Sequence, residues 1–346
     1  MATSLSHAYK DTHIQLSHII PLDFGSVRHL PDSHVWSAAH EAPARAEGAA
    51  PPVIDLQAPD AAGLVGEACR GWGVFQVTNH EVPGALVEEV EGHARRLFGL
   101  PAERKARALR TPSGATGYGV ARISPFFPKL MWHEGFTIMG GSAVEHAKQL
   151  WPHHYHHFCD AMDKYQKKMK SVAYKILLLI LKALGVDEEE LISSSSSFLM
   201  YQSDGALQLN SYPSCPNPSR AIGLALHTDS LLLTILHQND TDGLQILQEG
   251  VGWVRVPPIP GALVVNIGDL MHILSNGEFP TMCHRVVPNE TSHRFTMAYF
   301  YGPPADSVVA PLPNLPGPPR FRAATVKEYI GLKNKHLEKA LSLIQI

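Results

Sequence analysis

The chain has 346 residues, of which 45% are hydrophobic and 18% are charged, and its formal net charge is −3. This balance is typical of a globular protein with a large core, and it argues against nucleic acid or an anionic membrane as a partner. The sequence has no apolar run long enough to span a bilayer and no recognisable secretory signal. The four cysteines form no CxxC motif, which is typical of a reducing compartment. We therefore expect a soluble cytoplasmic protein.

The first half of the sequence is predicted to hold a leader and a small mixed subdomain. Residues 1–50, which end in a stretch rich in Ala, Pro and Glu, are interpreted as a mobile leader. Residues 51–155 are expected to form an N-terminal subdomain, in which 111–145 is irregular because it lacks hydrophobic periodicity. The regular elements predicted here are strands at 52–56 and 71–80 and helices at 60–71 and 84–100.

The second half begins with a long helix and continues as a strand-rich domain. A helix is predicted over 151–185, and residues 156–197 are interpreted as this helix followed by a serine-rich connector. From 198 to 305, short apolar runs alternate with turn residues, which is typical of a β-sandwich or barrel. Residues 306–346 are expected to form an extension that ends in a helix over 325–344. The predicted strands are 198–202, 206–212, 222–228, 231–236, 243–247, 252–258, 262–268, 284–287 and 294–300.

Two histidines are followed two residues later by an acidic residue, and one of these pairs is suited to bind a metal. With 20 His and 32 acidic residues in the chain, chance alone predicts roughly two such pairs. His336 and Glu338 lie in the predicted C-terminal helix, where residues two apart point in different directions. His227 and Asp229 lie in a predicted strand, where residues two apart share a face, so both side chains could reach one ion.

A third metal ligand is expected from a more distant strand. His284 begins the predicted strand at 284–287 and would complete a His, Asp and His triad with open coordination positions, which indicates non-haem Fe(II) oxygenase chemistry. His272 is the alternative third ligand, and His293 is predicted to lie at the surface. The cluster HHYHH at 153–157 has no carboxylate partner and is interpreted as a solvated helix face.

An arginine ten residues after His284 extends the pattern beyond metal binding. Arg294 and Thr296 lie two apart in a predicted strand, so their side chains share one face. A guanidinium group beside a hydroxyl group is suited to hold the far carboxylate of a dicarboxylic acid.

The order of these motifs resembles that of the plant 2-oxoglutarate- and Fe(II)-dependent dioxygenases. That family carries N-x-Y-P-x-C, H-x-D, a distal His and R-x-S in its C-terminal half, and this sequence departs from it in having Thr296 instead of Ser. The resemblance covers about residues 50–305. The matching stretches are PVIDL at 52–56, WGVFQVTNHEVP at 72–83, NSYPSC at 210–215, HTD at 227–229, His284 and RFT at 294–296.

The resemblance implies an α+β fold with a double-stranded β-helix (jelly roll) core flanked by helices. It implies that His227, Asp229 and His284 are the catalytic residues that hold Fe(II). It also implies that 2-oxoglutarate is the co-substrate, which binds the iron through its C1 carboxylate and keto oxygens, and that ascorbate supports activity. The residues that it assigns to 2-oxoglutarate are Arg294 and Thr296 at the C5 carboxylate, with Tyr212 and Asn210 adding hydrogen bonds.

A second stretch narrows the resemblance to one group of these enzymes. FFPKLMWHEGFTI at 126–138 is similar to the K-L-M-W-x-E-G-F-T-I stretch of gibberellin 3-beta-dioxygenases. This similarity implies hydroxylation of a gibberellin at C3 by O2 and 2-oxoglutarate, with succinate and CO2 as further products. A gibberellin is an apolar diterpenoid acid, so its pocket should be apolar with one cation, and we expect Arg122 to bind the carboxylate. The expected pocket walls are Phe127, Met131, Trp132 and Phe136.

Other functions remain open from the sequence. A gibberellin oxidase that hydroxylates C1 or C2 or introduces a 2,3-double bond would use the same residues, as would another plant 2-oxoglutarate dioxygenase. A zinc hydrolase could use the same three ligands, but it would need a general base and has no use for Arg294. A non-catalytic jelly roll that binds a small molecule is the third class. The expected partners are a gibberellin, 2-oxoglutarate and O2, and the protein is expected to be a monomer.

Overall fold

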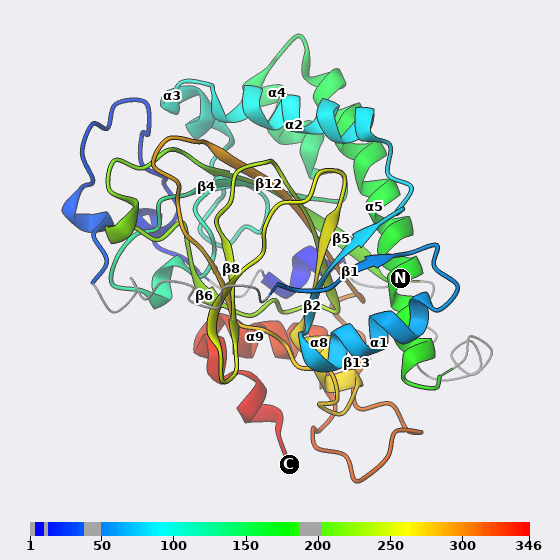
Figure 1. Ribbon diagram of the computed structural model, residues 1–346. Helices are drawn as coiled ribbons and strands as arrows, with labels where there is room; N and C mark the ends of the chain where they lie inside the picture. The colour runs from blue at the N-terminus through cyan, green and yellow to red at the C-terminus, as the bar shows by residue number, and fades with distance from the viewer. Residues whose placement is uncertain (1–3, 10–12, 38–49, 187–201) are drawn as a thin grey trace.

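Two facing β-sheets form the centre of the protein, whose computed structural model describes residues 4–9, 13–37, 50–186 and 202–346 (Figure 1). The major sheet has eight strands, in the order β1 (Val53–Asp55), β2 (Val74–Thr78), β10 (Leu263–Ile267), β7 (Leu233–Gln238), β12 (Arg294–Gly302), β5 (Asp204–Tyr212), β4 (Glu134–Met139) and β3 (Gly117–Gly119). The minor sheet has four strands, in the order β6 (Leu224–His227), β11 (His284–Val286), β8 (Leu244–Gln248) and β9 (Gly252–Arg255). This arrangement confirms the predicted jelly roll with flanking helices.

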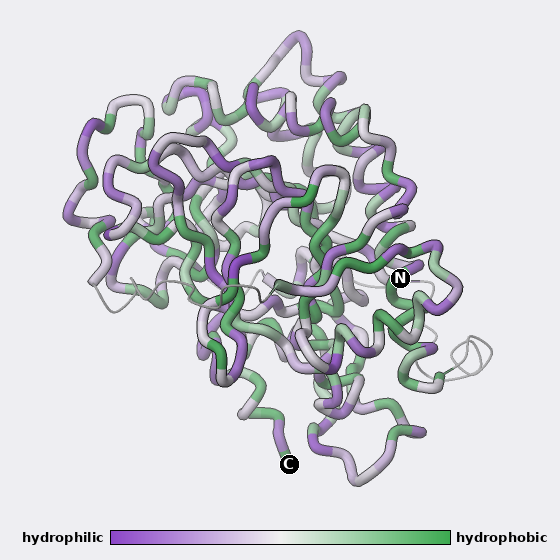
Figure 2. The backbone as a smooth tube through the Cα atoms, in the orientation of Figure 1, coloured by the Kyte–Doolittle hydropathy of each residue, from purple (hydrophilic) through white to green (hydrophobic). Residues whose placement is uncertain are grey.

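Side chains along the strands of the major sheet alternate between a cavity on one face of the sheet and the hydrophobic core on the other. On β12, Arg294 and Thr296 line the cavity between the sheets, whereas Phe295 and Met297 lie in the hydrophobic core on the other face. Strands β5, β4 and β7 show the same alternation, because side chains point to opposite faces of a strand at every step. Figure 2 shows that hydrophobic residues concentrate along the central strands.

Helices cover the core face of the major sheet. The long helix α5 (Tyr155–Ala183) contacts β5, β7 and β12, and α2 (Gly84–Phe98) packs beside it. The apolar residues of α5 recur at helical spacing, so one stripe of the helix faces the sheet. The other α-helices of the described residues are α1 (Ala61–Gly71), α3 (Ala102–Lys105), α4 (Ser142–Leu150), α8 (Asp269–Leu274) and α9 (Val326–His336). Among the described residues, no helix combines the length and apolarity needed to cross a membrane.

Several predicted elements differ in their limits. The helix expected at 151–185 begins only at Tyr155, because residues 151–154 separate α4 from α5. The C-terminal helix expected over 325–344 ends at His336, where Leu337 takes a positive φ of 45° and short 3-10 helices follow. The segment 111–145 is not irregular throughout, since it contributes β3 and β4 to the major sheet. The strand predicted at 198–202 lies almost entirely outside the described residues.

The described parts of the predicted leader pack against the folded domain. Ile19 and Trp36 are buried, and the Trp36 indole nitrogen donates to the Leu130 carbonyl oxygen (3.0 Å). The 3-10 helix η1 (Leu5–Tyr9) lies against α9, so segments near both ends of the chain meet. Residues 4–9 and 13–37 are therefore part of the fold, while the remaining boundaries of the five predicted segments stay predictions.

Candidate active site

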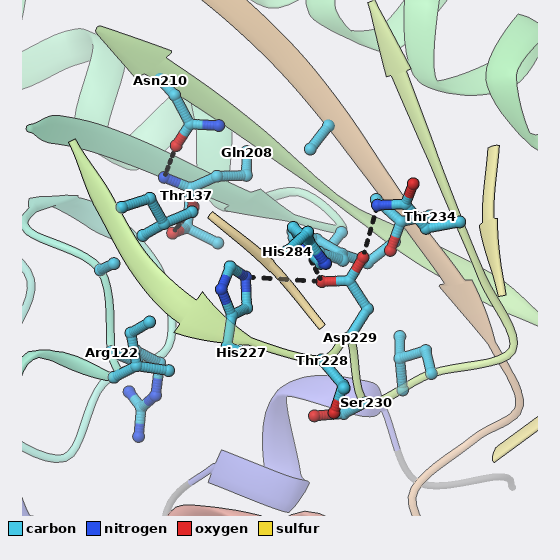
Figure 3. A pocket seen from close by; sticks show the side chains of 18 of the residues that line it. Arg122, Thr137, Gln208, Asn210, His227, Thr228, Asp229, Ser230, Thr234 and His284 are labelled. Carbon is cyan, nitrogen blue, oxygen red and sulfur yellow. Dashed lines mark hydrogen bonds and ion pairs between the residues drawn. The ribbon is translucent and has the colours of Figure 1, made fainter. Parts of the chain in front are cut away.

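His227, Asp229 and His284 converge between the sheets (Figure 3). His227 ends β6, and His284 begins β11 directly opposite it in the antiparallel ladder. The Nε2 atoms of both histidines lie 3.8 Å from Asp229 Oδ1. Asp229 lies beyond the end of β6, so the expectation that His227 and Asp229 share one strand face is wrong, although both side chains still reach a common centre. The turn after the strand directs the carboxylate toward the two rings.

The hydrogen bonds of the two histidine rings use their Nδ1 atoms and leave the Nε2 atoms free to bind a divalent ion. His227 Nδ1 donates to the Ala225 carbonyl oxygen (2.8 Å), and His284 Nδ1 donates to the Met282 carbonyl oxygen (3.1 Å). Because a carbonyl oxygen can only accept, the proton of each ring is on Nδ1, and each Nε2 lone pair points toward the centre. Two imidazole nitrogens and one carboxylate oxygen form the donor set of a non-haem Fe(II) site.

The charges of the triad also suit a cation. Burial and, to a smaller extent, the nearby His284 lower the pKa of His227 to about 3. Burial alone would raise the pKa of Asp229, but the two histidines and a hydrogen bond from Asn266 bring it below its usual value. The Asn266 amide nitrogen lies 3.2 Å from Asp229 Oδ2 and leaves Oδ1 facing the rings. The site is therefore a neutral His227 beside an ionised carboxylate, as metal binding requires.

A buried guanidinium group forms a second feature of the cavity. Arg294 is 1% exposed, and its Nη2 donates to Gln238 Oε1 (2.8 Å). Its Nε and Nη1 have no hydrogen-bond partner among the described residues. Thr296 and Tyr212 line the cavity beside it. A buried cation with free donors is suited to an anionic ligand.

Two further arginines line the same cavity. Arg122 donates from Nη1 to the Gly114 carbonyl oxygen, while its Nε and Nη2 have no partner in the described structure. Arg110 is 3% exposed, and burial, together with the charge of Arg122, lowers its pKa to about 9. The Arg122 guanidinium carbon lies 5.0 Å from the centre of the Tyr9 ring. Two desolvated cations held near each other in this way make a second site for an anion.

The four aromatic and sulfur-containing residues expected as pocket walls do not line the cavity. Phe136 lies on the core face of β4, and its neighbour Thr137 faces the cavity instead. Met131 and Phe127 pack in a small cluster with Trp36, and the Trp132 indole nitrogen donates to the Pro213 carbonyl oxygen (2.9 Å). These side chains belong to hydrophobic clusters of the fold. Arg122 is the one predicted substrate residue that the cavity lining includes.

The rival metal ligands are also accounted for. His272 lies on α8, where Nδ1 bonds the Phe279 carbonyl oxygen (2.7 Å), and it is not part of the triad. His293 is not a surface residue, since its ring stacks on Phe295 with centroids 4.0 Å apart and burial lowers its pKa to about 4. The histidines of the cluster at 153–157 are exposed, as predicted. Within the described residues, the triad is the single group that could hold a metal.

Sequence reasoning missed several residues that line the cavity. Gln208 could have been found, because it lies on the inner face of the strand that also carries Asn210 and Tyr212, whereas Thr137 lies on β4, which the sequence did not predict. Tyr9, Arg110 and Lys333 carry no local signal, since they come from distant segments that meet only in the folded chain.

The cavity argues against a hydrolase. Asp229 is the only carboxylate among the described lining residues, so no second acid is available as a general base. A jelly roll with a His-x-Asp and distal His triad in front of a buried arginine defines the class of Fe(II)- and 2-oxoglutarate-dependent oxygenases.

Comparison with known proteins agrees with this class. A family model described as the 2OG-Fe(II) oxygenase superfamily matches residues 203–303, and one described as "non-haem dioxygenase in morphine synthesis N-terminal" matches residues 51–157. Gibberellin 3-beta-dioxygenase 1 of Pisum sativum is 47% identical over 353 residues, covering 99% of this chain and 94% of that protein. Gibberellin 3-beta-dioxygenase 1 of Arabidopsis thaliana is 47% identical over 356 residues, covering 100% and 99%. The crystal structure of JOX2 in complex with 2OG, Fe and JA has a TM-score of 0.78 at 29% identity and covers 93% of each chain.

The chain belongs to the gibberellin 3-beta-dioxygenase family of the 2OG-Fe(II) oxygenase superfamily. It is therefore a dioxygenase that depends on Fe(II) and 2-oxoglutarate.

Proposed function

We propose that this protein hydroxylates a gibberellin at C3, in the 3-beta orientation, and converts 2-oxoglutarate and O2 to succinate and CO2. The relatives that it matches over nearly their full length are named for this activity. The observation that carries the proposal is one cavity that combines the metal triad, an apolar lining and the unpaired cations Arg110 and Arg122. A compact apolar acid matches that combination. The apolar lining residues include Ala121, Ile123, Phe126, Met139, Leu224, Leu236, Val286 and Phe300.

His227, Asp229 and His284 are proposed to bind the iron. Bound Fe(II) supplies the activation of O2, which amino-acid side chains alone do not provide. The protein holds both rings through their Nδ1–H bonds and holds the carboxylate through Asn266. These fixed orientations leave one face of the triad open toward the cavity, where both substrates must bind.

Arg294, Thr296, Tyr212 and Asn210 are proposed to bind 2-oxoglutarate. The free Nε and Nη1 donors of Arg294 suit the C5 carboxylate, and Thr296 and Tyr212 add hydroxyl groups next to it. Burial raises the pKa of Tyr212 to about 12, so its hydroxyl keeps its proton and can donate. Thr296 in place of the family's Ser retains this hydroxyl, and its side chain is 2% exposed in the cavity wall.

Arg122 is proposed to bind the gibberellin carboxylate, with Arg110 as a second donor that the sequence did not indicate. Fixing the acid group at the arginines would orient the diterpenoid and select the carbon that faces the metal. The apolar lining excludes water around that carbon, which protects the reaction from side products.

The test is product analysis with purified protein, Fe(II), ascorbate, 2-oxoglutarate and a panel of gibberellins. A 3-beta-hydroxylated gibberellin formed together with an equal amount of succinate is expected. Hydroxylation at C1 or C2, or a 2,3-desaturated product, would instead indicate a gibberellin oxidase of different regiochemistry. Failure to turn over any gibberellin would refute the proposed substrate.

Arginine variants test the carboxylate site. Replacing Arg122 or Arg110 by alanine should raise the gibberellin KM roughly 10- to 100-fold, because each would remove a charge-assisted hydrogen bond worth about 1.5–3 kcal/mol. The 2-oxoglutarate KM should not change. Arg107→Ala is the matched control, since Arg107 is exposed and lies outside the cavity. An unchanged gibberellin KM in both cavity variants would refute the carboxylate site. The monomeric state and the cytoplasmic location stay predictions.

A further inference from the structure

A buried histidine behind the co-substrate site has no role in the chemistry described above. His133 is 1% exposed, lies directly before β4 and does not line the cavity. Its Nε2 lies 3.0 Å from Asn210 Oδ1, and its Nδ1 has no partner among the described residues. The ring also packs against Tyr212, with centroids 5.1 Å apart. His133 thus contacts two residues proposed to bind 2-oxoglutarate without reaching the cavity itself.

The backbone carbonyl of Leu209 determines which atoms donate and which accept in the hydrogen bonds around Asn210. Gln208 Nε2 donates to the Leu209 carbonyl oxygen (3.2 Å), which can only accept, so this atom of Gln208 is the amide nitrogen. The same NH2 group lies 3.1 Å from the side-chain amide of Asn210, so the Asn210 atom that it contacts is the oxygen Oδ1. Asn210 Nδ2 therefore faces Thr296 and donates to its Oγ1 (3.1 Å). The Thr296 hydroxyl hydrogen must then point elsewhere, either into the cavity or toward the Tyr212 hydroxyl, which itself lines the cavity. In both cases a donor is directed at the co-substrate.

The protonation state of His133 agrees with this direction. Burial lowers the pKa of His133 to about 4, against the opposing effect of its hydrogen bond to Asn210, so the ring is neutral near pH 7. A neutral ring carries one N–H, and because Nε2 faces the Asn210 oxygen, the hydrogen is on Nε2. Asn210 Oδ1 thus accepts from both His133 and Gln208.

A glycine leaves space for the contacts between His133, Gln208 and Asn210. Gly135 pairs with Asn210 across the ladder between β4 and β5. A Cβ atom at Gly135 would lie 2.3 Å from Gln208 Nε2 and 3.1 Å from His133 Cε1. Any larger residue would push the Gln208 amide away from Asn210. The sequence His133-Glu134-Gly135 therefore supplies both the donor and the space that it needs.

We propose that His133 is a positioning residue for 2-oxoglutarate: it holds the Asn210 amide so that Thr296 and Tyr212 present hydrogen-bond donors to the C5 carboxylate. If the amide were reversed, its oxygen would face Thr296, and the Thr296 hydroxyl would turn back to donate to it. The co-substrate would then lose one donor. This inference rests on the proposed place of the C5 carboxylate beside Arg294 and Thr296, and it does not depend on which gibberellin is oxidised.

The test measures equilibrium binding rather than turnover. Calorimetry without O2, with Mn(II) as the metal, would compare 2-oxoglutarate with 2-oxopentanoate, in which a methyl group replaces the C5 carboxylate. His133→Phe removes the donor and retains a ring, and His133→Gln restores an N–H donor. His146→Phe is the matched control, because His146 is a partly buried histidine that, like His133, has a lowered pKa and lies outside the cavity.

His133→Phe should weaken 2-oxoglutarate binding about three- to tenfold, the range of one neutral hydrogen bond. Binding of 2-oxopentanoate should be unchanged, because it has no carboxylate at that end. His133→Gln and His146→Phe should stay within about twofold of the wild type. Equal weakening of both ligands, or no weakening of either, would overturn the proposal. Failure of the wild-type protein to turn over any gibberellin would refute the proposed substrate but would leave the role of His133 in place, because these affinities are measured without a gibberellin.

A second measurement needs no variant. Nitrogen NMR of the wild-type histidine rings should show His133 neutral and protonated on Nε2 from pH 8 to pH 5. A ring protonated on Nδ1 would overturn the proposal even if His133→Phe does not fold, because Asn210 Oδ1 would then have no donor in His133.

Discussion

Lys333→Met should cause a large loss of stability, because it removes one partner of a buried ion pair. Lys333 lies on α9, where its Nζ is 2.7 Å from Asp269 Oδ2 and also donates to the hydroxyl of Thr228, the residue between His227 and Asp229. The Lys333 and Asp269 side chains are 8% and 0% exposed. The pair therefore links the C-terminal helix to the metal-binding turn within the core.

The expected loss of stability depends on the hydrogen bonds that the Asp269 carboxylate retains in the variant. In Lys333→Met, the buried carboxylate retains only the bond from the Tyr329 hydroxyl (2.6 Å), because Oδ1 has no partner among the described residues. Removing one partner of a buried ion pair costs about 3–5 kcal/mol, since an uncompensated charge remains. Urea denaturation at pH 7.5, followed by circular dichroism, would measure this change in the free energy of unfolding.

Two comparisons decide whether this reasoning is correct. Lys167→Met removes an exposed pair with Asp163, whose side chains are 75% and 62% exposed, and should change stability by less than about 0.5 kcal/mol. The double variant Lys333→Met with Asp269→Asn should recover at least half of the loss, because no buried charge remains. A loss below about 1 kcal/mol in Lys333→Met, or no recovery in the double variant, would refute the argument.

Three further outcomes are expected. Mn(II) should raise the Tm of the wild type by a few degrees, because it binds only the folded triad, and Asp229→Ala should abolish this shift in differential scanning fluorimetry. Burial lowers the pKa of His34 to about 4, so the unfolded chain binds a proton that the native state does not, and stability should fall as the pH decreases from about 6.5 to 4. His34→Gln should reduce that slope in urea titrations, and an unchanged slope would contradict the assignment. Trp132 and Met131 belong to packed hydrophobic clusters rather than to the cavity wall. Trp132→Ala should therefore lose about 3–5 kcal/mol of stability, and Met131→Leu should leave the gibberellin KM at the wild-type value. A raised KM in Met131→Leu would show that Met131 contacts the substrate.

The sequence by itself predicted the three residues that converge as the candidate metal triad and the arginine that lies in the same cavity. The His-x-acid spacing of His227 and Asp229 also occurs at His336 and Glu338, so the prediction rested on the order of His227, Asp229, His284 and Arg294 along the chain. Arg294 and Thr296 lie on one face of β12. The shared face of Arg294 and Thr296 depends on the alternation of side chains along a strand, which is a local property of the backbone. This alternation does not explain His227 and Asp229, because Asp229 lies beyond the end of β6. The same alternation explains the error at Phe136, because residues 111–145 carried no periodic pattern and the strand β4 was not predicted.

Only the tertiary structure decided which residues close the cavity around the triad. Tyr9, Arg110 and Lys333 come from segments far apart in the sequence, and each joins the site because of long-range packing between helices and sheets. His133 contacts Asn210 only because β4 pairs with β5 and Gly135 leaves space between them. No local sequence pattern predicts these long-range contacts, because they are stabilised by burial and hydrogen bonds that exist only when the whole chain has folded.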